Sequence, residues 1–586
     1  MKTNFLLNPK FILFIIIVYP LLFIWQGLDV FDVGFSLTSY QEIFNDPESV
    51  SFSSFLWLTN IIGGVWLLLF GDSLGLVGAN LAGVFVTYMT IIFSYLILKP
   101  YIEKRYLLIG LALVLILSRC TLQVIDYDNL TGLFFVASAF FLIKGLKHKG
   151  IWQTLISGLI LGLNIFIRLP NIIGFALIFA IFFYGYIEKL PFKLQIKQGI
   201  FFILGYAAAI IITFSVMKIL GHYEIYINSI YQLFNNTTYV AEGKLGSDNL
   251  KSMLIIFIKE YLKVFGFLAI GIMFILPLSK TFSLFKNRYP YYGFIIVISA
   301  IVFFLSLEGY NLVRPMIILM VGIMYMILFM YIINMEKSNN HYRLIAFIAF
   351  LILFITPLGS ASALARAIYA IWLPIPIIIT FLFRLKQVGM EIETVSELSS
   401  NRFRIGLNEK ETYLAKNFVI ICFFTFSLLL SFTFINAYSI NRFDMRYTID
   451  NPRLKGIFIT KEGADSMQEV LDELNKYVKE DDYLFTYEYI MILHFLTKTK
   501  PYISCQRAQL YPIARFKGLF NEAMKEKSYL PVVVINNSSL QDKNVYTVVV
   551  EEFLDRNHYK PVWKNEIFEI LIPSSDKTKA SLGEAL

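Results

Sequence analysis

The feature that most constrains this chain is a long series of apolar runs, each long enough to cross a membrane. A helix needs roughly 20 mainly apolar residues to span the hydrocarbon core of a bilayer. Charged residues make up only 16% of the chain, against about a quarter in soluble proteins. We therefore predict a mainly α fold, a polytopic transmembrane helical bundle of about 13 spans. The predicted spans are 11–27, 74–98, 106–124, 129–144, 152–168, 171–187, 199–219, 253–278, 290–306, 315–335, 343–358, 367–384 and 416–437.

One further apolar run, 54–70, is either a fourteenth span or a pair of helices at the outer surface. Lys and Arg concentrate in the cytoplasmic loops of membrane proteins. If the N-terminus is inside and 54–70 does not span, every short inner loop is basic. The stretch 27–73 then lies outside, and it contains no Lys or Arg but six acidic residues. The charges therefore predict a first outer loop, 27–73, with surface helices, and they account for the net charge of +9 without a nucleic-acid partner.

The chain changes character after the last predicted span, because residues 438–586 are polar and charged. Two helix-like segments alternate there with three β-rich runs. The helices are expected at 461–478 and 516–527, and the strands at 483–487, 531–536 and 545–550. Such alternation is typical of a small α/β domain. We predict a transmembrane domain at 1–437 and an extracytoplasmic α/β domain at 438–586.

Three acidic residues follow predicted spans on the outer side. Asp32 lies just beyond the first span, and Asp126 and Asp128 lie between the third and fourth. Ionisable groups at the membrane are costly and often functional. Two carboxylates two residues apart can share a divalent cation such as Mg²⁺ or Mn²⁺, or can orient a hydroxyl group. Asp32 is as ordinary as a helix cap or a solvated loop acid, and Asp128 with Asn129 could equally cap the fourth helix.

Several arginines break the positive-inside pattern, because they lie at predicted outer helix ends. They include Arg168, Arg314 and Arg366. A guanidinium group can grip two phosphate oxygens at once. The alternative for any one of them is that the side chain reaches up to the lipid headgroups. Five scattered histidines and three cysteines without metal-ligand spacing argue against a zinc site.

Four segments, taken in chain order, resemble the C-type (GT-C) superfamily of integral-membrane glycosyltransferases. They read FDVGFSLTSYQ, LWLTNIIGGVWLLLFGDSLGLVGANLAG, VIDYDNLTGLFF and GLILGLNIFIRLPN. The resemblance covers residues 1–190 and is architectural beyond them. Two departures restrict it: no WWDYG-like block of the oligosaccharyltransferases is present, and Val33 stands where the aminoarabinose transferases carry a second acid.

The resemblance implies a polyprenyl-phosphate sugar donor and transfer, with inversion, to a hydroxyl group of a glycan, lipid or protein. On that reading Asp32 is the catalytic base. Asp126 and Asp128 bind the acceptor or a divalent cation (Mg²⁺ or Mn²⁺), and the donor phosphate is held by Arg314, Arg366 or Arg168.

We expect a bacterial inner membrane, with the N-terminus cytoplasmic and the C-terminal domain periplasmic or extracellular. The alternative is a polytopic transporter or flippase of a lipid-linked glycan, which would carry buried charges at mid-membrane and would need no large outer domain.

Overall fold

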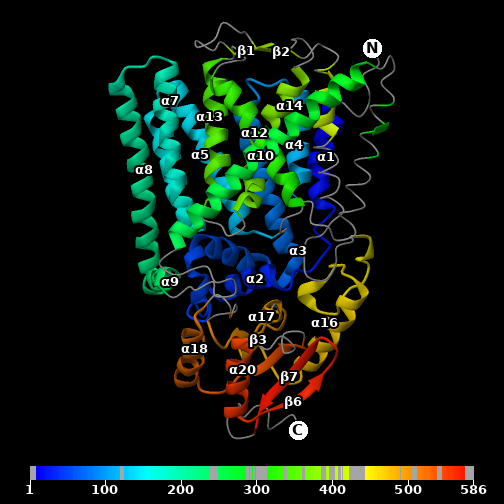
Figure 1. Ribbon diagram of the computed structural model, residues 1–586. Helices are drawn as coiled ribbons and strands as arrows, with labels where there is room; N and C mark the ends of the chain where they lie inside the picture. The colour runs from blue at the N-terminus through cyan, green and yellow to red at the C-terminus, as the bar shows by residue number, and fades with distance from the viewer. Residues whose placement is uncertain are drawn as a thin grey trace.

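The computed structural model shows a helical bundle with a smaller mixed domain packed against one end (Figure 1). We call this end of the bundle the domain side. The structure describes residues 8–118, 124–235, 249–284, 313–333, 339–358, 363–384, 391–394, 403–406, 413–421, 442–488, 490–504, 511–537 and 544–574, with isolated positions 290, 293, 294, 297, 411 and 508. The predicted spans 290–306 and 416–437 lie largely outside these residues.

The bundle confirms the predicted mainly helical fold. Its elements are α1 (Pro9–Leu21), α2 (Asp32–Glu42), η2 (Ser51–Leu56), α3 (Trp57–Leu98), α4 (Lys104–Ser118), α5 (Tyr127–His148), α6 (Ile151–Ile167), η3 (Leu169–Ile178), α7 (Phe179–Ile187), α8 (Phe192–Ile219), α9 (Tyr223–Asn235), α10 (Asn249–Ser283), α12 (Val313–Ile332), α13 (Asn340–Ile355), η5 (Ala363–Ala370) and α14 (Pro374–Arg384). A short hairpin of β1 (Glu391–Thr394) and β2 (Phe403–Gly406) lies at the end opposite the domain side (Figure 1).

Four stretches of the described chain are long and apolar enough to cross a membrane, so the chain is an integral membrane protein. They are Ser51–Leu98, Tyr127–His148, Leu169–Ile187 and Phe192–Ile219. Five shorter apolar helices of 10–17 residues accompany them. The number of spans, about 13, stays a prediction.

Helix α3 is two helices joined at a kink, which bears on the ambiguous run 54–70. Gly75 breaks the helix with φ 51° and ψ −137°, a conformation in which any Cβ would be strained. Near its start, the Thr59 hydroxyl donates to the carbonyl of Ile167, at the end of α6. Just before the kink, Asp72 pairs with Arg453 of the C-terminal domain. Both ends of the first half therefore have contacts on the domain side, and the assignment of 54–70 to surface helices stays a prediction.

The C-terminal domain is a mixed five-stranded sheet with helices, in the strand order β4-β3-β5-β7-β6. The first three strands are parallel and the last two are antiparallel to their neighbours. The elements are η6 (Arg442–Asp444), η7 (Pro452–Leu454), α16 (Lys461–Leu474), β3 (Tyr483–Tyr487), α17 (Ile492–Thr497), β4 (Lys500–Pro501), α18 (Ile513–Glu526), β5 (Val532–Asn536), α20 (Val545–Arg556), β6 (Tyr559–Lys564) and β7 (Phe568–Pro573).

The prediction of a strand at 545–550 is wrong, because these residues begin helix α20. The side chain of Asn544 accepts hydrogen bonds from the backbone N–H groups of Tyr546 and Thr547. An asparagine in this position caps a helix, and the cap outweighs the strand preference of the Val-rich run that follows. The predicted strands at 483–487 and 531–536 and the helices at 461–478 and 516–527 are confirmed, with small shifts of their ends.

Helix α2 lies between the bundle and the C-terminal domain. Nine of its 11 residues are buried, although its sequence is largely polar. Val33 and Leu37 belong to the apolar core of the C-terminal domain. Tyr40, further along the helix, donates from its hydroxyl to the carbonyl of Ile125, just before α5. The helix is therefore fixed to both parts of the molecule.

Glu42, the last residue of α2, is only 2% exposed. Burial raises its pKa from 4.5 to about 7, the charge of Lys500 opposes this rise, and Asp46 and Asp481 add to it. Between these two pH values the folded protein holds a proton that the unfolded chain releases. Ionised Glu42 therefore costs stability above pH 7, by at most roughly 3 kcal/mol.

We expect Glu42→Gln to raise the thermal unfolding temperature above pH 7 and to change it little near pH 4, because the amide is neutral throughout. Unfolding in detergent followed across this pH range measures the effect. Glu48→Gln, at an exposed position in the same loop, is the matched control and should leave the profile unchanged. A Glu42→Gln variant less stable than wild type at pH 8 would contradict the cost of burial.

Candidate functional site

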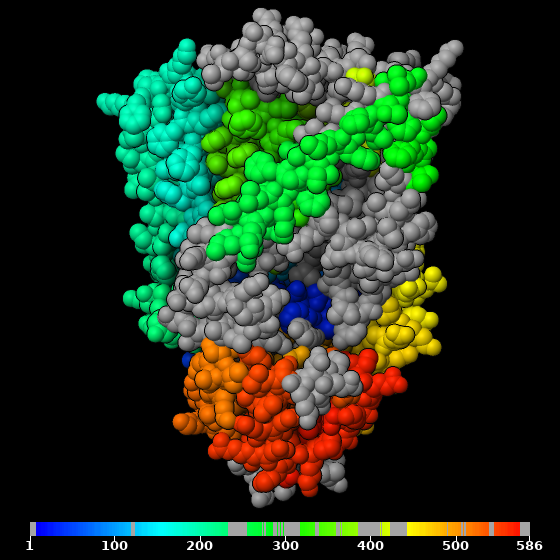
Figure 2. All heavy atoms as spheres, in the orientation of Figure 1, coloured from blue at the N-terminus to red at the C-terminus, as the bar shows by residue number. Residues whose placement is uncertain are grey.

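Four segments meet on the domain side and bring together most of the predicted site residues. Asp32 begins α2, Asp126 precedes α5, Arg168 follows α6, and Arg366 lies in η5. In the space-filling view, atoms of the N-terminal part of the chain show at the surface between the bundle and the C-terminal domain (Figure 2).

Asp126 is the N-cap of α5, whereas the sequence suggested Asp128 with Asn129 for that role. Its carboxylate accepts a hydrogen bond from the backbone N–H of Asn129 at 2.6 Å. The residue is only 2% exposed. Burial raises its pKa, the Asn129 N–H and the charge of Arg366 oppose the rise, and the charge of Asp32 adds to it. Asp126 is therefore a buried helix cap whose ionised form is disfavoured by burial.

The start of α2 is held by a local turn. The carboxylate of Asp29 accepts hydrogen bonds from the backbone N–H groups of Phe31 and Asp32, at 2.8 and 2.9 Å. Asp29 is buried, whereas Asp32 is partly exposed. The turn therefore fixes the backbone of Asp32.

Asp128 forms the centre of a buried ion cluster. One of its oxygens lies 3.4 Å from the guanidinium of Arg168, and the other contacts the guanidinium of Arg366. The side chains of Asp128 and Arg168 are 3% and 8% exposed, whereas that of Arg366 is 25% exposed. Arg366 can therefore reach a ligand, and Arg168 stands behind it as a second positive charge.

Tyr127 joins the two arginines from the side. The guanidinium carbons of Arg168 and Arg366 lie 5.9 and 5.7 Å from the centre of its ring. Arg366 also donates to the Tyr127 hydroxyl at 3.4 Å, and lies 5.8 Å from the ring of Tyr369. These aromatic faces stabilise cations and restrict the directions in which the guanidinium groups point.

Arg168 is placed by a break in the helix. Its backbone is extended, with φ −159° and ψ 124°, so α6 ends at Ile167. The side-chain amide of Asn171 donates to the Thr131 hydroxyl at 2.7 Å and to Asn164 at 3.0 Å. Thr131 lies one turn after Asp128 in α5. Asn171 therefore ties the segment that carries Arg168 to the helix that carries Asp128.

Arg314 is the predicted phosphate ligand that the structure does not place. It lies in the first turn of α12, but its side chain is outside the described residues. Sequence reasoning missed Tyr127 and Tyr40. Tyr127 stands inside the Asp-Tyr-Asp triplet, so an aromatic residue between two acids was the signal available for it.

The predicted divalent cation does not suit the residues around it. Both oxygens of Asp128 contact guanidinium groups, which already supply positive charge. One oxygen of Asp126 is used by the helix cap. Among the described residues, no group of three His, Cys, Asp or Glu side chains is arranged to hold a metal ion. A metal at Asp126 and Asp128 stays a prediction, and no step below depends on it.

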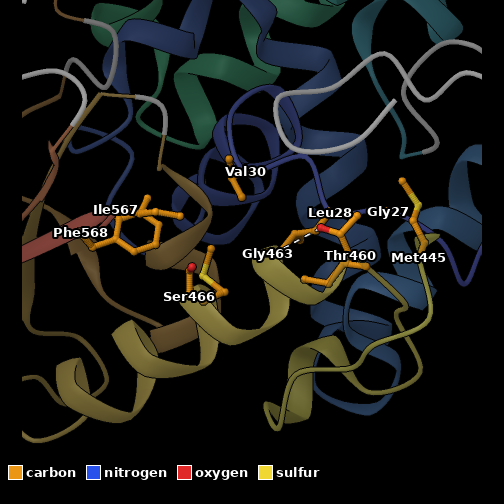
Figure 3. A pocket seen from close by; sticks show the side chains of 11 residues that line it. Gly27, Leu28, Val30, Met445, Thr460, Gly463, Ser466, Ile567 and Phe568 are labelled. Carbon is orange, nitrogen blue, oxygen red and sulfur yellow. Dashed lines mark hydrogen bonds between the residues drawn. The ribbon is translucent and has the colours of Figure 1, made fainter. Parts of the chain in front are cut away.

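A small cavity, about 30 Å³ in volume, lies away from this cluster, where the segment Gly27–Val30 meets α16 and β7 (Figure 3). Its lining is mostly apolar and includes Leu28, Met445, Met467 and Phe568. Such a volume holds about one or two water molecules, so it admits neither a sugar nor a lipid chain. We assign it to packing between the segment Gly27–Val30 and the domain.

The sequence matches no known protein-family profile and no curated protein. Among solved structures it is similar to the crystal structure of ArnT from Cupriavidus metallidurans in the apo state. The match covers 96% of this chain and 98% of that chain, at 12% sequence identity and a TM-score of 0.38. At that score the likeness carries no weight for the chemistry, which depends on the residues of this chain.

We expect Asp128→Asn to destabilise the protein by about 3–5 kcal/mol, because it leaves two guanidinium groups without their buried counter-charge. Unfolding in one detergent at fixed pH and salt measures the loss. Asp72→Asn is the control, since Asp72 is 80% exposed in its pair with Arg453 and should cost less than about 1 kcal/mol. Equal losses for the two variants would mean that the Asp128 cluster is not structural.

Proposed function

We propose that the protein is a membrane glycosyltransferase that moves a sugar from a polyprenyl-phosphate donor to a hydroxyl group of a glycan, lipid or protein. The reaction takes place on the domain side of the bundle, which the charge pattern predicts to be the outer face. The observation that supports this most is the buried ion cluster of Asp128, Arg168 and Arg366, in which the side chain of Arg366 stays 25% exposed. Arg366 offers a cation, and the partly exposed Asp32 at the start of α2 offers a carboxylate.

These two groups match what the transfer requires. The phosphate of the donor is already a good leaving group, so the site needs a base for the acceptor and positive charge for the departing phosphate. Asp32 takes the proton of the acceptor hydroxyl. The acceptor oxygen then bonds to the anomeric carbon, and the bond from that carbon to the phosphate oxygen breaks.

The electron pair of the broken bond leaves with the phosphate, and Arg366 neutralises the charge that develops there. Arg168 adds a second positive charge through the shared Asp128, and Arg314 stays a predicted further ligand of the phosphate. Attack from the face opposite the phosphate inverts the anomeric centre. Asp126 orients the acceptor hydroxyl toward Asp32.

A transporter or flippase of a lipid-linked glycan is the alternative. Such a protein must bind the same phosphate, so the arginines alone do not distinguish the two functions. It breaks no glycosidic bond and needs no base, so it should release no free polyprenyl phosphate. The release of that product is therefore the measurement that separates them.

We expect Asp32→Asn to lower the release of polyprenyl phosphate by about 10²–10⁴-fold, the range for loss of a general base. Purified protein is supplied with lipids extracted from its own membrane, and the product is quantified by mass spectrometry. Glu48→Gln, an acid at an exposed position of the same loop, should retain wild-type release. Equal release from Asp32→Asn and wild type would remove Asp32 from the mechanism, and no release from wild type would favour transport.

We expect Arg366→Lys to raise the KM for the donor by about 10–100-fold, because one charge remains while the paired hydrogen bonds to phosphate are lost. Initial rates at varied donor concentration measure this, and unfolding curves confirm that the variant is folded. An unchanged KM with a lowered kcat would show that Arg366 acts only after the donor is bound.

A further inference from the structure

The C-terminal domain makes a close backbone contact with the first turn of α2. A Cβ atom added to Gly34 would lie 2.4 Å from the backbone nitrogen of Ile492 and 2.8 Å from its Cα. These distances are far below ordinary contact, and both atoms belong to the main chain. The two backbones therefore touch directly, with no side chain between them that could adjust.

Hydrogen bonds flank this contact on both sides. The backbone N–H of Ile492 donates to the carbonyl of Val30 at 3.1 Å. The hydroxyl of Thr38 donates to the carbonyl of Met491 at 3.2 Å and to that of Gly34 at 2.8 Å. Asp32 lies between Val30 and Gly34 in the chain. The turn at Met491 and Ile492 thus holds α2 immediately before and immediately after Asp32.

The far end of α2 is fixed to the same domain. Arg453 donates to the side chain of Gln41 and to the carbonyl of Phe495, both at 2.6 Å. Its guanidinium carbon also lies 4.5 Å from the centre of the Phe495 ring. A helix of 11 residues is about 16 Å long, so contacts at both ends leave it no freedom to rotate or slide independently of the domain.

We infer that the Met491–Ile492 turn of the C-terminal domain is a positioning element for Asp32, so that the domain forms part of the active site. This inference rests on the proposed role of Asp32 as base. The turn touches no substrate, and it acts by fixing the helix that carries the carboxylate relative to Asp126. Displacement of a catalytic group by about 1 Å can cost about 10²-fold in rate.

The test is a double-mutant cycle in the full-length protein. Gly34→Ala inserts a methyl group against the Ile492 backbone and must shift α2, although alanine itself favours a helix more than glycine does. We expect a loss of about 10²-fold in polyprenyl phosphate release. In the Asp32→Asn background, the same substitution should cause no further loss, because the displaced carboxylate is already absent.

Multiplied losses in the double variant would overturn the inference, because they would mean that Gly34→Ala damages the enzyme independently of Asp32. Wild-type release by Gly34→Ala would also overturn it. Gly71→Ala is the matched control. Its new Cβ would meet only the side chain of Leu67 at the ordinary distance of 3.5 Å, so its release should equal that of wild type.

A second measurement does not depend on activity and separates this inference from the proposed function. Amide hydrogen exchange is measured in the full-length protein for wild type, Gly34→Ala and Thr38→Val. Exchange should become about 10-fold faster in both α2 and α17, while α5 stays unchanged. If Asp32→Asn is fully active, Asp32 is not the base and the proposed mechanism is wrong. The exchange rates then still show whether the Met491–Ile492 turn holds α2. Unchanged exchange in α2 would overturn the inference.

Discussion

The enclosure of α2 is the interaction on which the rest of the structure depends. A largely polar helix of 11 residues is buried along nearly its whole length, which is costly unless its polar groups find partners. The polar groups of α2 find hydrogen-bond partners in both the C-terminal domain and the bundle. The hydroxyl groups of Thr38 and Tyr40 donate to main-chain carbonyls of Met491 in the domain and of Ile125 before α5. The helix therefore links the domain to the bundle and brings Asp32 to the charged residues at the start of α5.

The charged side chains of Asp128, Arg168 and Arg366 form an ordered cluster on the domain side. Asp128 holds Arg168 and Arg366 together, whereas two like charges at that separation would otherwise repel each other. Because Arg168 is almost fully buried and Arg366 is not, only the guanidinium of Arg366 is exposed enough to contact a ligand. A phosphate that binds Arg366 thus meets a site whose positive charge is already arranged, with little cost for ordering side chains.

Much of this organisation can be predicted from the sequence, and the failures have physical causes. The absence of Lys and Arg from 27–73 predicts that the run 54–70 stays on one side, because positive charge concentrates in cytoplasmic loops. The prediction of a strand at 545–550 is wrong because β-branched residues can also form a helix when a cap such as Asn544 begins it. The pairing of Asp128 with Arg366 joins residues far apart in the chain, and no local pattern encodes such a contact. The sequence predicts Asp32 and Asp126 on the same side of the membrane. It does not indicate that the C-terminal domain contacts the helix that begins with Asp32.

The joining of α2 to the C-terminal domain also determines the order in which the protein can be assembled. The hydrogen bond from Thr38 to Met491 spans 453 residues, so the partner of α2 is synthesised only after every span of the bundle has been made. Until the C-terminal domain has been synthesised, Val33 and Leu37 lack the apolar core against which they pack in the folded protein. Contacts this distant in sequence form slowly. The contacts between α2 and the domain are therefore among the last that the chain can form, and a chain that stops short of the C-terminal domain would leave α2 without them.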